Sequence, residues 1–169
     1  MNLKIEHIRC PLHRYTFSVR PIRKWVERNC EGLVLNLFAG TTKLGINEVR
    51  NDLDLNAPAD YHLDALEFVR NWTGESFRTI LLDPPYALRK SMELYEGRIC
   101  SPFRQLKDAL PRILQPDGII ITFGYHSIVM GSGRNFMPER LCLFSHGGAI
   151  HDTIATVERH IITNINHHE

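Results

Sequence analysis

The residues most able to do chemistry are Asp83, Pro84, Pro85 and Tyr86, which follow an apolar run at residues 79–82. An aliphatic run that stops at two prolines predicts a buried strand ending in a stiff, extended loop, because proline lacks a backbone N–H and has a fixed φ. The loop offers a carboxylate and a carbonyl to accept the two hydrogens of an amino group, and a ring to stack on the flat group that carries it. The four residues therefore predict a site for an aromatic amine at a strand's carboxyl end, where open α/β sheets bind ligands.

The hydrophobic pattern on either side of this loop predicts an α/β fold. Short aliphatic or β-branched runs bounded by turn residues are typical of strands, and apolar residues spaced by three or four are typical of helices. Strands are expected at residues 33–38, 48–52, 60–63, 78–82, 119–123, 140–145 and 153–160. Helices are expected from Pro21 onward and at residues 65–69 and 102–114, with a turn at residues 115–118. Residues 1–20 show no clear periodicity, so no element is expected there.

The Asp83–Tyr86 loop resembles the catalytic motif of S-adenosylmethionine-dependent methyltransferases that modify exocyclic amino groups of nucleobases. The family includes DNA adenine-N6 and cytosine-N4 enzymes and some RNA guanine-N2 enzymes. Upstream, residues 33–40 form an apolar run that leads into a glycine turn, which is similar to the first cofactor motif of the same family. The order of the two motifs along the chain therefore agrees with the resemblance.

The resemblance implies a three-layer, Rossmann-like methyltransferase sheet that is mostly parallel and ends in a C-terminal antiparallel hairpin. It implies one methyltransferase domain over residues 1–169, in which an N-terminal segment with its helix, residues 1–30, packs on the core. It also implies S-adenosylmethionine as the cofactor.

The resemblance further implies the catalytic roles of the loop. Asp83 and the Pro84 carbonyl would hold the target amine, and Asp83 would balance the positive charge that grows on its nitrogen. Pro85 keeps the loop extended, and Tyr86 would stack on the base. A base inside a duplex cannot reach the methyl group, so the target must be flipped out or unpaired.

The cofactor is expected at the ends of the first two strands. The backbone at Ala39, Gly40 and Thr41 must approach a ligand closely, which favours small residues, and Phe38 would pack under the cofactor. Asp52, at the end of the second strand, can bind both ribose hydroxyls.

Three further acids adjoin the expected cofactor site. Asp64, with Ala65, stands where the family places an acid against the cofactor's adenine, and capping the following helix is the alternative role for Asp64. Asp54 is expected to cap a turn. Asp83 adjoins both the cofactor and the amine.

The target is expected to be nucleic acid, with DNA favoured over RNA. Arg89 and Lys90 follow the Asp83–Tyr86 loop and are predicted phosphate contacts. Tyr125 and His126, after the fifth strand, are candidates for the base pocket, although a histidine is more often structural. A basic cluster in the first thirty residues is either a solvated face or a second nucleic-acid contact; it contains Arg9, Arg14, Arg20, Arg23, Lys24 and Arg28.

Composition narrows the class of protein. The chain has 169 residues, a net charge of +1 and 43% hydrophobic residues, as expected for a globular domain with a core. No apolar run is long enough to span a membrane, and the N-terminus lacks a signal-peptide pattern. Four scattered cysteines suit a reducing, cytoplasmic setting. No metal is expected, because Cys10 and His13 have no second close pair of ligands.

The sequence departs from the family pattern between the first two strands. Only nine residues, 39–47, connect them, whereas a crossover helix normally needs about 10–12. The first crossover helices are therefore predicted to be shortened, which leaves an apolar flank for the N-terminal segment or a second subunit to cover. A homodimer or a partner subunit is accordingly expected. Asn36 and the spacing of Gly40 and Gly45 also differ from the common family pattern.

The function most favoured by these residues is methylation of adenine N6 in DNA. The alternatives are methylation of an RNA base amine and a catalytically silent, nucleic-acid-binding partner subunit. Methylation of a protein amide or a small molecule is less favoured, because relatives with those substrates more often carry Asn in place of Asp83.

Overall fold

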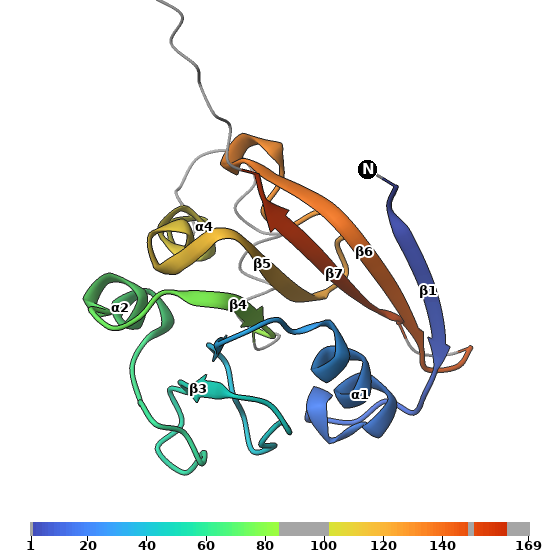
Figure 1. Cartoon of the computed structure of the whole chain (residues 1–169). Coiled ribbons are helices and arrows are strands. Elements are labelled where there is room, and N and C mark those ends of the chain that lie inside the picture. Colours follow the sequence, from blue (N-terminus) through green and yellow to red (C-terminus); the bar gives the residue numbers. More distant parts are fainter. Residues whose placement is uncertain (1, 85–101, 149–150, 162–169) are drawn as a thin grey trace, which may run out of the picture.

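The computed structural model describes residues 2–84, 102–148 and 151–161. Its centre is a seven-stranded sheet with the strand order β1-β6-β7-β5-β4-β2-β3. Figure 1 shows these strands spread from β1 at one edge to β3 at the other. The strands are β1 (Lys4–Arg9), β2 (Val34–Asn36), β3 (Glu48–Arg50), β4 (Phe77–Leu82), β5 (Leu114–Gly124), β6 (Phe136–Ser145) and β7 (Thr153–His160). The α-helices and 3-10 turns are η1 (Thr16–Ser18), α1 (Arg20–Asn29), α2 (Ala65–Asn71), α4 (Pro102–Ala109), η2 (Leu110–Ile113) and η3 (Ser132–Arg134).

Four neighbouring strands, β3, β2, β4 and β5, run parallel to one another. Their carboxyl ends therefore lie at the same edge of the sheet, which brings the segments that follow them together. β7 pairs antiparallel with both β5 and β6, which confirms the predicted C-terminal hairpin. The turn predicted at residues 115–118 interrupts the pairing of β5 with β4, and Asp117 there has a φ of 58°.

Helical segments cover both faces of the sheet, which confirms the three-layer fold. One face buries Val34, Leu81 and Ile121 against η1 and α1, whose buried apolar side chains are Phe17, Ile22, Trp25 and Val26. Trp25 packs edge to face against Phe123 and Phe144 of the sheet. The opposite face packs against α2, α4 and η2, whose buried side chains are Phe68, Val69, Phe103, Leu106, Leu110 and Ile113.

The shortened crossovers are confirmed. Residues 37–47 and 52–60, all of which the structure describes, contain no helix. The flank that a first crossover helix would cover is instead packed by η1 and α1, together with the buried Leu44 of the connection itself. The N-terminal segment therefore covers this flank, as one of the two sequence alternatives predicted.

Two elements differ in kind from the sequence prediction, and two strands begin earlier than predicted, β5 at Leu114 and β6 at Phe136. The strand expected at residues 60–63 is reduced to a single bridge between Asn51 and Tyr61. Conversely, residues 4–9 form β1, which pairs in parallel with β6 although no element was expected there. β1 alternates partly buried and exposed side chains, and it exists because β6 supplies hydrogen-bond partners more than 130 residues away. The seventh strand thus comes from the chain's N-terminal segment.

Within the described residues, no helix is long and apolar enough to cross a membrane.

Candidate functional site

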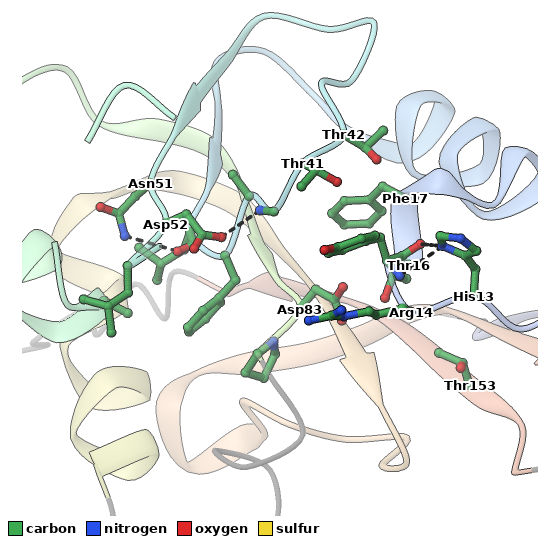
Figure 2. Close-up of a pocket in the computed structure, with 18 of the residues that line it drawn as sticks. His13, Arg14, Thr16, Phe17, Thr41, Thr42, Asn51, Asp52, Asp83 and Thr153 are labelled. Atoms are coloured by element: carbon green, nitrogen blue, oxygen red, sulfur yellow. Dashed lines mark hydrogen bonds between the residues drawn. The ribbon is translucent and has the colours of Figure 1, made fainter. Parts of the chain in front are cut away.

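A pocket of about 730 Å³ lies at the carboxyl ends of β2, β3 and β4, within the usual size range of small-molecule sites. Its sheet side is made by segments that directly follow strands. Its opposite side comes from the N-terminal segment and from residues near β5 and β7 (Figure 2). The residues that line it are Leu12–Phe17, Leu37–Thr42, Asn51–Leu53, Leu63–Ala65, Asp83, Pro84, Tyr125, His151 and Thr153.

The loop after β2 is joined to the end of β3 by Asp52. Its Oδ2 accepts a hydrogen bond from the Gly40 backbone N–H over 2.7 Å, and its Oδ1 accepts one from the Asp54 N–H over 2.9 Å. Gly40 has a φ of +56°, which favours glycine, and a Cβ built there would meet nothing within 4 Å. The backbone at Gly40 is therefore open to a ligand. Phe38, Ala39 and Thr41 also line the pocket.

Asp54 does not line the pocket and caps a turn, as expected. Its Oδ1 accepts hydrogen bonds from the backbone N–H and the side-chain amide of Asn56. These hydrogen bonds, the backbone one first, hold the pKa of Asp54 below its ordinary value.

Asp64 is the N-cap of α2 and lines the pocket at the same time. Its Oδ1 accepts hydrogen bonds from the N–H groups of Leu66 and Glu67, at 2.9 and 3.2 Å. Ala65, the first residue of the helix, lines the pocket beside it. Both cap bonds use Oδ1 of the carboxylate. Asp64 can therefore cap the helix and still offer its other oxygen to a ligand in the pocket.

Asn51 holds Leu63, the residue directly before Asp64, and was not singled out from the sequence. Its buried side chain donates to the carbonyls of Leu37 and Leu63 and accepts from the Leu63 N–H. The side chain thereby joins the end of β2 to the segment before α2, where a third strand would have made such bonds through the backbone. The only signal for this role in the sequence is that Asn51 directly precedes Asp52.

Asp83 and Pro84, the two residues of the Asp83–Tyr86 loop that the structure describes, both lie at the pocket. Asp83 is partly buried and Pro84 is buried, and both line the pocket directly after β4. Pro85, Tyr86, Arg89 and Lys90 lie outside the described residues.

The two candidates after β5 have different surroundings. Tyr125 lines the pocket, is 40% exposed, and makes an edge-to-face contact with His151 at 6.1 Å between ring centroids. His126 is exposed and is not among the residues that line the pocket.

The N-terminal segment forms a wall of the pocket that the sequence reasoning did not predict. Figure 2 shows His13, Arg14, Thr16 and Phe17 entering the site from this segment. The Arg14 guanidinium lies over the Tyr15 ring, 5.4 Å from its centroid. A hydrogen bond of 3.0 Å between the hydroxyls of Ser18 and Thr42 ties the segment to the loop after β2. Membership of Arg14 in the basic cluster was the only sequence signal for this wall.

Beneath the pocket, a buried ion pair supports the loop after β2. Arg50 and Glu48, both on β3, are 2.7 Å apart and have side chains only 4% and 1% exposed. The Arg50 guanidinium also donates to the carbonyls of Ala39, Gly40 and Thr42.

Among the residues described, no group of three or more His, Cys, Asp or Glu side chains is placed to hold a metal ion. Cys10 instead has its sulfur 3.8 Å from Nδ1 of His146.

In comparisons with known proteins, no family model and no curated protein matches the chain. Solved structures do match. The N-methyltransferase NodS from Bradyrhizobium japonicum WM9 has a TM-score of 0.59 at 12% identity, over 88% of this chain and 99% of NodS. TrmN from Thermus thermophilus has a TM-score of 0.57 at 16% identity, over 88% of this chain and 50% of TrmN.

A third match is the 1,6-didemethyltoxoflavin-N1-methyltransferase of Burkholderia thailandensis, whose structure contains S-adenosylhomocysteine. Its TM-score is 0.57 at 13% identity, over 83% of this chain and 77% of that enzyme. At these sequence identities, similarity to the solved structures establishes the fold alone. The chain has the Rossmann-like methyltransferase fold, in agreement with its strand order.

Proposed function

We propose that this chain is an S-adenosylmethionine-dependent methyltransferase that acts on an exocyclic amino group of a nucleobase. The observation that carries the proposal is the meeting of Gly40, Asp52, Asp64 and Asp83 in one pocket. These residues follow different segments of the sheet edge, so only the fold brings them together. In open α/β sheets this edge is where nucleotide-like ligands bind.

The residues of the pocket suit the cofactor. Gly40 leaves open backbone, Asp52 offers a strand-end carboxylate to ribose hydroxyls, and Asp64 lies where an adenine amino group could donate to it. Two of the structures with this fold, NodS and the Burkholderia enzyme, hold S-adenosylhomocysteine, and both are N-methyltransferases. Bound here, S-adenosylmethionine supplies a methyl group on a positively charged sulfur.

Asp83 and Pro84 would act on the acceptor amine. The Asp83 carboxylate and the Pro84 carbonyl are acceptors at the wall of the pocket, and the two hydrogens of an aromatic amine are donors. Holding both hydrogens fixes the nitrogen lone pair in one direction, which is the alignment that a direct displacement needs. As the new N–C bond forms, the S–C bond of the cofactor would break and S-adenosylhomocysteine would leave as a neutral thioether. The negative charge of Asp83 would stabilise the positive charge that develops on nitrogen, and the methylated nitrogen would then release a proton to solvent.

We further propose that the methyl acceptor belongs to a nucleic acid. Arg14 brings a positive charge to the pocket, and Tyr15 and Tyr125 are partly exposed aromatic rings beside it. A cation and stacking rings suit the phosphate and the base of a flipped nucleotide. The resemblance of Asp83–Tyr86 to adenine-N6 enzymes favours adenine in DNA. An RNA base amine is the second candidate, because unpaired RNA bases need no flipping.

We also propose a cytoplasmic location and association with a second copy or a partner subunit. Cys10, Cys30 and Cys142 are free thiols, which suits a reducing compartment. The edge strand β1 exposes the apolar side chain of Ile5, which is 67% exposed, and Leu3 directly before the strand is 43% exposed. Light scattering of the full chain over a range of concentrations would test association, and a monomer throughout would contradict it.

The test of the proposed function is transfer of labelled methyl groups from S-adenosylmethionine to mixed DNA, RNA and protein, followed by nucleoside analysis. The full chain is compared with its Asp83→Ala variant. Label in N6-methyladenine of DNA supports the favoured target, and label in an RNA base supports the second candidate. Label in protein alone would contradict a nucleobase target. Cofactor binding without transfer to any substrate would support the silent-partner alternative.

A further inference from the structure

The loop after β2 carries backbone carbonyls that a crossover helix would normally satisfy. In a helix, each carbonyl accepts a bond from an N–H four residues later, and unpaired buried carbonyls are costly. Residues 37–47 are described throughout and contain no helix, so the carbonyls of Ala39, Gly40 and Thr42 need other donors.

Arg50 supplies these donors from below the pocket. Its Nη1 donates to the Thr42 carbonyl at 2.8 Å, and its Nη2 donates to the carbonyls of Ala39 and Gly40 at 3.3 and 3.0 Å. Its Nε donates to the Pro58 carbonyl at 2.8 Å, which adds the connection after β3 to the same cluster. Only arginine has a fork of donors that can serve four carbonyls at once.

Glu48 completes the cluster. One oxygen of its buried carboxylate accepts from Arg50 Nη1 at 2.7 Å and from the Leu44 N–H at 2.9 Å. The other oxygen accepts from the side-chain amide of Asn36 at 3.0 Å. The charge of Arg50 is therefore balanced inside the protein, and both ends of the loop after β2 are tied to β3.

The orientation of the loop follows from these contacts. The Gly40 carbonyl is turned to Arg50, while the Gly40 N–H points to Asp52 at the pocket. Any shift of the guanidinium would rotate the peptides on both sides of Gly40 and move the Asp52 contact with them.

We infer that Arg50, with Glu48, is a positioning residue that replaces the crossover helix and sets the loop at Ala39–Thr42 for the cofactor. The inference rests on the proposed function for the identity of the ligand. The geometry of the loop itself can be tested without any ligand.

The test uses the full chain and two matched arginine variants. Arg50→Lys keeps the charge but lacks the fork. Arg159→Lys is the control, because Arg159 also contacts two carboxylates and a carbonyl, those of Glu31, Glu139 and Asp117. Arg159 pairs with Ile119 in the sheet, at the opposite end of β5 from the pocket. Three quantities are measured: hydrogen exchange of residues 39–44, the Kd for S-adenosylhomocysteine, and the thermal midpoint.

We expect faster exchange at residues 39–44 in Arg50→Lys, and a Kd for S-adenosylhomocysteine that rises about tenfold, as for loss of one ligand hydrogen bond. If transfer activity is present, the KM for S-adenosylmethionine should rise by the same factor while kcat at saturation changes by less than about twofold, since ground-state binding is what is lost. Arg159→Lys should lower the thermal midpoint without changing these values.

An unchanged loop exchange in folded Arg50→Lys would overturn the inference, as would equal effects of the two variants on the Kd. If Arg50→Lys does not fold, Glu48→Gln replaces it, because it keeps the shape of the carboxylate and removes its charge. The same outcomes then apply. A wild-type chain that fails to bind S-adenosylhomocysteine would instead refute the proposed cofactor, and the exchange data would still decide whether Arg50 positions the loop.

Discussion

The carboxylate of Asp52 and the backbone N–H of Gly40 are hydrogen bonded, with 2.7 Å between Oδ2 and N. This contact joins the ends of two adjacent parallel strands, β3 and β2, at the mouth of the pocket. It places a carboxylate beside backbone that is open to the pocket.

Replacement of Asp52 by alanine should weaken cofactor binding. The variant loses a charged acceptor for ribose hydroxyls and also frees the Gly40 N–H, so we expect a Kd for S-adenosylhomocysteine about 10–100-fold higher. Calorimetry on the full chain measures it. Asp54→Ala is the control, because Asp54 caps an exposed turn and should leave the Kd unchanged. Equal affinity of Asp52→Ala and the wild type would remove the ribose assignment.

Replacement of Gly40 by alanine should weaken the binding of S-adenosylhomocysteine and also lower the stability of the fold slightly. The positive φ of +56° costs a non-glycine residue roughly 1 kcal/mol, and the added methyl group would stand in open space at the pocket. Gly131→Ala is the matched control, since Gly131 has a φ of +74° and does not line the pocket. Both variants should unfold at lower denaturant concentrations, but only Gly40→Ala should bind S-adenosylhomocysteine more weakly. A similar Kd for the two would argue against close approach of the ligand at Gly40.

Replacement of Asp83 by alanine should abolish methyl transfer and leave cofactor binding nearly intact. Asp83 is expected to contact the amine and to balance charge that exists only during transfer, and such a contact contributes about 10²–10³ in rate. Single-turnover transfer to the best nucleic-acid substrate, with calorimetry alongside, separates the two effects. Near-normal transfer by Asp83→Ala would show that the amine is activated elsewhere.

Stability at acid pH should depend on Glu31. Hydrogen bonds and charge from Arg159, and then from Arg78, hold the pKa of Glu31 below its ordinary value in the folded chain. The stabilising contribution is therefore complete above the unfolded pKa of about 4.3 and is lost as pH falls through the lower folded pKa. Urea unfolding at pH 5 and pH 3 should show a smaller loss for Glu31→Gln than for the wild type. Glu75→Gln, at an exposed position, should behave like the wild type, and the prediction is refuted if Glu31→Gln does so too.

Much of the fold could be predicted because it depends on local patterns. The run at residues 79–82 is apolar enough to be a buried strand whatever its neighbours are, and the prolines after it must end it. The hairpin strand β7 was predicted with its observed bounds, Thr153–His160. The positions of Gly40, Asp52 and Asp64 followed from the order of strands, because parallel strands end at one edge.

Other features depend on partners that are distant in the sequence, so no local pattern could reveal them. β1 is a strand only because β6 pairs with it, and residues 60–63 fail to become one because a single bridge to Asn51 is all the pairing they find. The pocket wall at Arg14 exists because η1 and α1 pack over the flank that the short crossover leaves bare.

The chemical types present at the site were thus determined by the sequence, and their arrangement was decided by the tertiary structure. Asp52 and Asp83 are acids at predictable strand ends, but the contact of Asp52 with Gly40 requires β2 and β3 to be adjacent. Arg50 reads in the sequence as an ordinary charged residue. It becomes a buried support for the loop only where folding removes it from water and turns three carbonyls of that loop toward it, because a buried charge must be paired and hydrogen bonded.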